Sequence, residues 1–143
     1  MLTDIDGIEV GNWSDTEAKT GCTVILFPEG TTASGEIRGG APATRDFALL
    51  HPSRSVERID SVVLSGGSAY GLAACEGVMS FLEERGQGFA TSSGKVPIVV
   101  GMSLFDLNEG DSTRRPGAKE GREAAERASS TKTDVGLIGA GTG

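Results

Sequence analysis

The sequence is short of residues that carry much catalytic and structural chemistry. Aromatic residues make up 5% of its 143 residues, and hydrophobic residues of all kinds make up 37%. The one histidine, His51, excludes a histidine-rich metal site, and any Ser-His-Asp triad would rest on it alone. Because Pro52 follows it, we expect His51 in a surface loop.

Cysteines and long apolar runs are also scarce. Cys22 and Cys75 are the two cysteines, and they form neither a Cys-x-x-Cys pair nor a disulfide framework. Each lies in an apolar stretch, so we expect two buried free thiols. No apolar run approaches the roughly 18 residues of a membrane span, and the N-terminus lacks a basic-then-apolar leader. These absences predict a cytoplasmic protein.

The net charge limits the possible partners of the protein, and the glycine content limits how its core is built. A net charge of -7 argues against a surface for nucleic acids or anionic membranes. Glycine is abundant, with 22 residues where average usage would give about 10. A core with few aromatic residues must therefore be built from small and β-branched side chains packed close to the backbone.

Periodicity predicts one domain, residues 1–143, of mixed strands and helices. Apolar alternation or continuous apolar runs predict strands over 7–13, 21–28, 59–67, within 95–107 and over 134–138. Small residues over 31–40 predict a further strand, paired with 21–28 in a hairpin around Pro28-Glu29-Gly30. We expect one or two helical turns within 41–52 and a polar loop over 108–117.

Two helices are predicted, over about 69–86 and 118–130. In the first, Leu72, Cys75, Met79 and Leu82 share one face, and Arg85 lies in the last turn before Gly86. Gly71 and Gly77 weaken this helix by about 1 kcal/mol each, which is tolerable if it packs close against a sheet. In the second helix we expect Glu120 and Arg127 to face water.

Two glycine-rich turns are candidate sites. The final residues, Gly139-Ala140-Gly141-Thr142-Gly143, supply the first two glycines of a dinucleotide fingerprint, without its third glycine, its helix or its acidic partner. The other turn, in "LSGGSAYGLAA" (64–74), joins a strand to a helix. Backbone N–H groups at such a helix start bind anions or developing oxyanions.

Ser68 and Tyr70 in the second turn each have two interpretations. Ser68 is a good N-cap, and Gly66-Gly67-Ser68 also approaches a nucleophile elbow, although its second glycine is one place late and only His51 could be the base. Tyr70 either covers the sheet edge or reaches into a cleft as a hydrogen-bond donor.

Four segments, in order and at matching spacings, resemble one family. They are "RGGAPATRD" (38–46), "VLSGGSAYGLAACEGVM" (63–79), "VPIVVGMSLFDL" (96–107) and "GLIGAGTG" (136–143). They are similar to the DmpA-type peptidases, which include L-aminopeptidase/D-Ala-esterase/amidases, β-peptidyl aminopeptidases and nylon-oligomer hydrolases. The resemblance covers nearly the whole chain from Gly7.

The resemblance implies an α/β fold, a four-layer αββα sandwich of which this chain supplies part. It implies the α-side portion of a self-processing hydrolase that cleaves peptides, amides or esters. The nucleophile would be the N-terminal Ser or Thr of a β subunit, downstream of Gly143, so no catalytic residue is expected in this chain. The implied partners are that β segment and further copies of the αβ unit. No metal, organic cofactor, nucleic acid or membrane is implied.

Carried over by motif, the expected substrate-binding residues are Gly66, Gly67, Ser68, Tyr70, Phe105 and Asp106. Many family members have a tyrosine of the oxyanion site where this sequence has Phe105, so the usual hydroxyl is absent there. The alternative from the residues alone is a non-catalytic α/β domain that binds a small anion or nucleotide through its glycine-rich turns.

Overall fold

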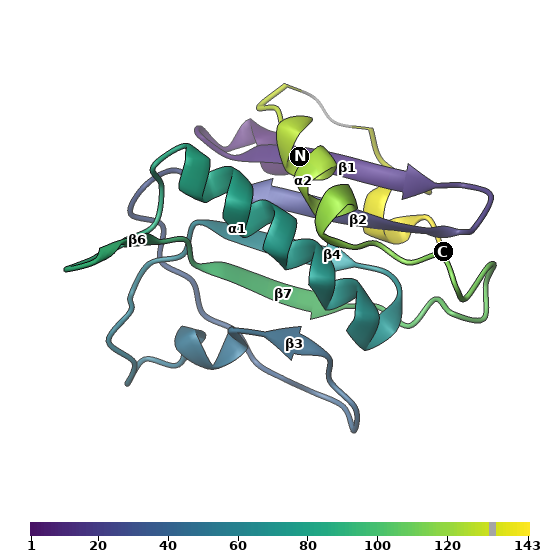
Figure 1. The fold of residues 1–143 in the computed structure, drawn as a ribbon, viewed down its shortest axis with the longest axis horizontal. Coiled ribbons are helices and arrows are strands. Elements are labelled where there is room, and N and C mark those ends of the chain that lie inside the picture. The colour runs from purple at the N-terminus through teal and green to yellow at the C-terminus, as the bar shows by residue number, and fades with distance from the viewer. Residues whose placement is uncertain (132–133) are drawn as a thin grey trace.

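A mixed five-stranded sheet forms the centre of the computed structural model, which describes residues 1–131 and 134–143 (Figure 1). The strand order is β1-β2-β4-β7-β3, with β4 and β7 parallel and the other neighbours antiparallel. The strands are β1 Glu9–Asp15, β2 Thr20–Leu26, β3 Thr44–Arg45, β4 Ser61–Ser65 and β7 Val99–Ser103. The C-terminal ends of β4 and β7 therefore meet at one edge of the sheet.

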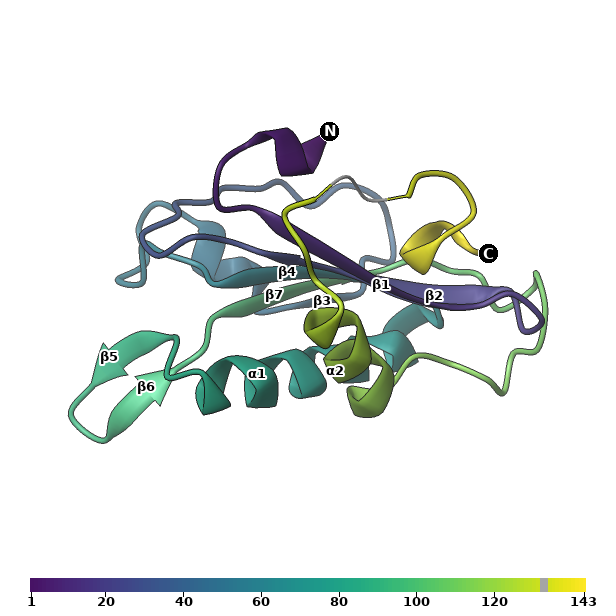
Figure 2. The ribbon, with the colours of Figure 1, turned by 90° about the horizontal axis from the view of Figure 1, so that it is seen from above.

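Two α-helices cover one face of this sheet, α1 at Ala74–Glu84 and α2 at Ala118–Glu126 (Figure 2). A small hairpin of β5, Phe89–Thr91, and β6, Gly94–Val96, stands away from the body after α1. Four short 3-10 helices are also described, two in connections, η2 Phe47–Leu50 and η3 Ser68–Ala73, and two near the ends of the chain, η1 Leu2–Asp4 and η4 Gly139–Gly141. The terminal helices η1 and η4 lie on the face opposite α1 and α2.

The densest core lies between the sheet and the two α-helices. Its buried residues are small or β-branched, as the scarcity of aromatic residues predicts. Cys22 and Cys75 belong to it as free, fully buried thiols, which confirms that prediction. Other members are Trp13, Val24, Leu26, Val63, Ala74, Val78, Leu82, Val99, Ala124 and Ala125.

The two α-helices cross where each has a glycine. A Cβ at Gly77 would collide with the carbonyl oxygen of Ala118, and one at Gly121 would collide with that of Ala74. Gly77 thus serves close packing, as expected, but its neighbour is α2 rather than the sheet. The absence of a Cβ at these glycines allows the two backbones to approach each other, at a cost in helix propensity.

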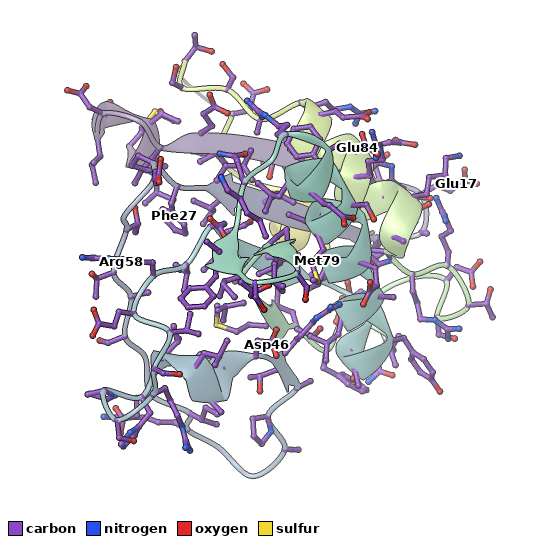
Figure 3. The ribbon with its side chains drawn as sticks, turned by 60° about the vertical axis from the view of Figure 1, so that its left-hand side comes forward. Glu17, Phe27, Asp46, Arg58, Met79 and Glu84 are labelled. Carbon is purple, nitrogen blue, oxygen red and sulfur yellow. The ribbon has the colours of Figure 1, made fainter. Side chains whose placement is uncertain are left out.

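The opposite face carries smaller apolar clusters. Ile8, Val10 and Ile25 form one, and Ile59, Ile98 and Val100 form another beneath the 27–58 connection. Figure 3 shows the ends of the molecule, with Glu17 in the turn between β1 and β2 on one side and Phe27 and Arg58 on the other. No helix in the described part of the chain is both long and apolar enough to cross a membrane.

Several predicted elements are present, and three predictions are wrong. Residues 31–40 form no strand, and the partners of β2 are β1 and β4. Residues 134–138 form no strand, because Gly136 has φ +116° and the Ile138 amide donates to the Gly136 carbonyl at 2.8 Å in a tight turn. Thr133, which precedes this segment, lies outside the described residues.

The third correction concerns Glu120, which is buried, whereas Arg127 is exposed as expected. Glu120 accepts hydrogen bonds from the Gly117 amide at 2.9 Å and from Arg114 at 3.1 Å. Burial raises the pKa of its carboxyl, but these hydrogen bonds outweigh burial, and the pKa lies below its ordinary value. The side chain thus fixes the start of α2 instead of facing water.

Candidate functional site

The turn after β4 is held by a hydrogen bond at each of its first three amides. The Gly66 amide donates to the Gly21 carbonyl at 2.8 Å, and the Ser68 amide donates to the Leu104 carbonyl at 2.9 Å. Between them, the Gly67 amide donates to Asp106 Oδ1 at 2.6 Å. These N–H groups are therefore occupied by the chain itself and are not offered to an external anion. The small-anion alternative loses these three donors.

Ser68 does not cap the following helix. Gly67, with φ +82°, occupies the N-cap position of η3, and no side-chain cap hydrogen bond is formed there. Ser68 itself has φ +55°, a left-handed conformation that L residues other than Asn and Asp adopt at a cost. The N-cap interpretation of its hydroxyl is thus wrong, and Ser68 is a strained residue at the mouth of the turn.

Asp106 lies beneath the turn rather than on the surface. Its carboxyl is buried, with Oδ1 accepting from the Gly67 amide and Oδ2 accepting from Thr20 Oγ1 at 2.7 Å. A Cβ at Gly66 would collide with Oδ2, which explains the glycine there. Asp106 therefore joins the end of the 104–106 segment to the start of β2 and to the turn after β4.

Tyr70 and Phe105 flank this junction and face outward. Tyr70 is 63% exposed and Phe105 is 67% exposed. The Arg115 guanidinium lies 4.1 Å from the centre of the Tyr70 ring, a cation–π contact. A Cβ at Gly67 would come within 3.0 Å of Arg115 Cβ, so this arginine also lies against the turn.

The second glycine motif is brought to the same edge of the sheet. The Gly139 amide donates to Ser14 Oγ at 2.7 Å, and the Ala140 amide donates to Thr23 Oγ1 at 3.1 Å. At the end of this segment, a Cβ at Gly143 would lie 2.8 Å from Asp106 Cβ. The turn at 66–68 and the final residues thus meet around Asp106, although more than 70 positions separate them in the sequence.

Sequence reasoning missed several residues that build this junction. The sequence pattern marks Thr20, Ser14 and Thr23 only as residues in or beside strands, and Arg115 only as part of a polar loop. The hydroxyl groups have no local signal, because their partners are 86 to 125 positions away. The order of the four family motifs is the signal that links these regions.

The loop that carries Arg115 is anchored through its neighbour. Arg114 pairs with Asp15 at 3.2 Å and with Glu120 at 3.1 Å, and its guanidinium lies 4.8 Å from the Trp13 ring centre. Arg114 is thus committed to structure, whereas Arg115 donates only to the Ser112 carbonyl among the hydrogen bonds of the described residues.

His51 lies away from this junction. It is exposed in the loop after η2, as predicted, and its Nδ1 lies 2.8 Å from Ser53 Oγ. It borders a hollow of about 280 Å³ with Leu49, Leu50 and Val56. Within residues 1–131 and 134–143, no three His, Cys, Asp or Glu side chains gather as metal ligands would.

The matching family model spans the whole chain, residues 1–143, and is described as peptidase family S58. The chain belongs to peptidase family S58. Among curated proteins, the chain is 44% identical to an uncharacterized aminopeptidase of Mycobacterium leprae, over 99% of its own length. It is 30% identical, over 96% of its length, to a 6-aminohexanoate-oligomer endohydrolase of a Kocuria species.

Solved structures share the fold at lower sequence identity. The chain superposes on a β-aminopeptidase from a Burkholderia species with a TM-score of 0.74 and 20% identity, covering 99% of this chain and 42% of that one. It superposes on the L-aminopeptidase D-Ala-esterase/amidase of Ochrobactrum anthropi with a TM-score of 0.72 and 18% identity, covering 99% and 43%. The Ochrobactrum enzyme is described as a new variant of the Ntn hydrolase fold.

These S58 matches confirm both the resemblance and the fold class. The five-stranded sheet and the helices on its face correspond to part of the larger DmpA-like fold. It spans 43% of the length of the M. leprae relative and 36% of the Kocuria relative.

Proposed function

We propose that this S58 chain is the α-side portion of a self-processing amidohydrolase or aminopeptidase with an N-terminal nucleophile. Residues 1–143 form a single unit of that enzyme, and the nucleophilic Ser or Thr lies on a segment downstream of Gly143. The substrates are small peptides, amides or esters. The partners are that remaining segment and further αβ units, and the assembly is cytoplasmic.

The single observation that carries this proposal is the S58 match over the whole chain. The geometry supports it, because the turn at 66–68, the 104–106 segment and Gly143 converge at one edge of the sheet. Gly143 packs against Asp106, so a downstream segment that carries the nucleophile would begin close to this turn.

The candidate substrate-binding residues divide into two groups by their exposure. Tyr70 and Phe105, with the exposed part of Ser68, form the surface that a substrate would touch. Gly66, Gly67 and Asp106 are buried beneath them. We propose that the first group contacts substrate and that the second shapes the surface on which the first group stands.

The chemistry proposed for the complete enzyme is acyl transfer to the N-terminal Ser or Thr, followed by transfer to water. In the first step the nucleophile's oxygen bonds to the substrate carbonyl carbon, and the amine leaves after taking a proton. The free α-amino group of the nucleophile serves as base. This chain's part is to bind and orient the substrate so that its carbonyl faces the nucleophile and, in the second step, water.

The test is to express the complete gene product and analyse it by intact-mass spectrometry. We expect two polypeptides, the second beginning with Ser or Thr, together with hydrolysis of amino acid p-nitroanilides or 6-aminohexanoate oligomers. Substitution of that first Ser or Thr by Ala should leave a single unprocessed polypeptide without activity. An unprocessed wild-type protein that hydrolyses none of these compounds would refute the proposal.

Two aromatic residues allow a finer test. Phe105→Tyr should be tolerated, because it supplies the hydroxyl that many family members have there, whereas Phe105→Ala should weaken substrate binding. Tyr70→Phe tests whether the Tyr70 phenol acts on the oxyanion, since loss of one oxyanion donor typically lowers turnover about 10²–10³-fold. Unchanged turnover in Tyr70→Phe would restrict this ring to stacking with Arg115.

A further inference from the structure

We propose that Asp106 is a positioning residue, which sets the conformation of the Gly66–Ser68 turn and with it the placement of Ser68 and Tyr70. This role rests on the proposed function, because it concerns the surface on which substrate would bind. It assigns Asp106 no contact with substrate, in contrast to the expectation from the motif alone.

The first support is the engagement of both carboxylate oxygens. Oδ1 accepts from the Gly67 amide at 2.6 Å and Oδ2 accepts from Thr20 Oγ1 at 2.7 Å, and both hydrogen bonds are buried. Hydrogen bonds to an ionised acceptor are short and about twice as strong as neutral ones. A carboxylate committed in this way holds its neighbours and has no free oxygen pointing at the surface.

The second support is the close fit of the backbone around this carboxylate. A Cβ at Gly66 would collide with Oδ2, and one at Gly143 would lie 2.8 Å from Asp106 Cβ. Three segments that are distant in sequence therefore pack against one side chain: the turn, the start of β2 and the last residue. A shift of Asp106 would move all three.

The third support is the strain in the residue that the turn presents. Ser68 is held at φ +55°, between the anchored Gly67 amide and the hydrogen bond from its own amide to the Leu104 carbonyl. Such a conformation persists only where the surroundings enforce it. The Asp106–Gly67 hydrogen bond is one of the two that enforce it, and Tyr70 follows directly in η3.

The experiment compares Asp106→Ala, Asp106→Asn and Thr20→Val in the complete protein, with Glu109→Gln as a control. Glu109 is an exposed carboxyl three positions away, so its substitution matches the loss of charge without touching the turn. Thr20→Val removes the Oδ2 partner but leaves the Gly67 hydrogen bond. The readouts are amide hydrogen exchange over residues 64–70, and kcat and KM measured separately on an amino acid p-nitroanilide.

For Asp106→Ala we expect exchange at Gly67 to rise at least about 10-fold, because its hydrogen bond to a charged group is lost. We expect kcat to fall about 100-fold with a smaller change in KM, as for a misplaced substrate surface. Asp106→Asn keeps an acceptor without the charge and should show about a 3-fold to 10-fold loss of kcat. Thr20→Val leaves the buried Oδ2 without its donor but keeps the Gly67 hydrogen bond, so both readouts should change less than in Asp106→Ala, with at most about a 10-fold loss of kcat. Glu109→Gln should leave both readouts within about 3-fold of the wild type.

Wild-type exchange and wild-type kcat in Asp106→Ala would overturn the proposal. If Asp106→Ala does not fold, Asp106→Asn decides, and wild-type values in both readouts for that variant also overturn it. Thr20→Val weakens the same junction but keeps the Gly67 hydrogen bond, so equal losses in Thr20→Val and Asp106→Ala would reduce the role of Asp106 to stability and overturn the proposal. If the wild-type protein cleaves no amide, the proposed function fails, and exchange at Gly67 still decides whether Asp106 holds the turn.

Discussion

The two faces of the sheet differ in how completely they are covered. On the helix-covered face, Val24, Val63 and Val99 of the sheet are at most 1% exposed beneath α1 and α2. On the opposite face lie the terminal segments and the 27–58 connection, and the exposed apolar residues include Val135 and Leu137, each 83% exposed. One face is therefore covered by the two α-helices, whereas the other combines two smaller buried clusters with the exposed apolar side chains of the 134–138 turn.

This difference fits a chain that spans 43% of its M. leprae relative. Large exposed apolar side chains on one face are characteristic of a surface that another segment covers. The prediction that Val135, Leu137 and Ile138 are paired in a sheet with another chain remains a prediction for the complete protein, since in this structure they form a tight turn.

The largest effect should come from shortening a side chain in the core between the sheet and the α-helices. Leu82→Ala removes a side chain that is 1% exposed and should lower the free energy of unfolding by about 2–5 kcal/mol. Leu137→Ala, the same change at 83% exposure, should cost less than about 0.5 kcal/mol if the opposite face stays open. Chemical denaturation of the complete protein measures both, and a large cost for Leu137→Ala would show that the remaining segment covers it.

A somewhat smaller effect is expected where the helices cross. Gly77→Ala raises helix propensity, yet its Cβ would collide with the Ala118 carbonyl. We expect destabilisation of about 1–3 kcal/mol, because overpacking outweighs propensity. Ser80→Ala, on the exposed side of the same helix, provides the control and should be neutral within about 0.5 kcal/mol. Stabilisation by Gly77→Ala in thermal melts would contradict the close crossing.

Alkaline pH should lower the free energy of unfolding through the two thiols buried between the sheet and the α-helices. Burial raises the pKa of Cys22 to about 12 and that of Cys75 to about 11, from an ordinary value of 9.0. Between pH 9 and about 11 the unfolded thiols lose protons that the folded ones keep, so stability falls as pH rises. The slope should approach about 1.4 kcal/mol per pH unit for each thiol. A Cys22→Ala and Cys75→Ala double variant should lack this part of the slope.

The smallest effect should occur outside both faces, at the turn after β4. Ser68→Ala removes no cap hydrogen bond and leaves the left-handed conformation in place. We therefore expect a change in the free energy of unfolding below about 0.5 kcal/mol, whereas Ser68→Gly should stabilise by relieving strain. A loss near 1 kcal/mol in Ser68→Ala, measured by chemical denaturation, would reinstate a capping role for its hydroxyl.

Sequence patterns were informative where local periodicity and burial agree. The runs at 21–28 and 59–67 became β2 and β4, and the 3.6-residue period after Ala69 became η3 and α1, which ends at Glu84 beside Arg85 and Gly86. The candidate site was located by motif, because its glycines and serine lie together in one short stretch. Family membership followed from the order of four such stretches.

The remaining features depend on contacts between distant residues. Residues 31–40 contain too few large side chains to favour a strand. The strands that pair with β2 are β1 and β4 instead. The helical pattern predicts that Glu120 faces water, because it does not show the hydrogen bonds from Arg114 and the Gly117 amide that hold the side chain in a buried position. The burial of Asp106 likewise has no local signal in the sequence, because its partner Thr20 is 86 positions away.

The pairing of Val10 with Ser129 has a consequence for self-association. β1 is an outer strand of the sheet, and such strands present unpaired backbone groups to any extended chain in solution. The Val10 amide and carbonyl bond instead to Ser129, at 3.0 and 3.2 Å, where the chain returns after α2. Another strand could pair along the whole of β1 only after displacing this contact. The two hydrogen bonds between Val10 and Ser129 therefore oppose edge-to-edge aggregation through β1.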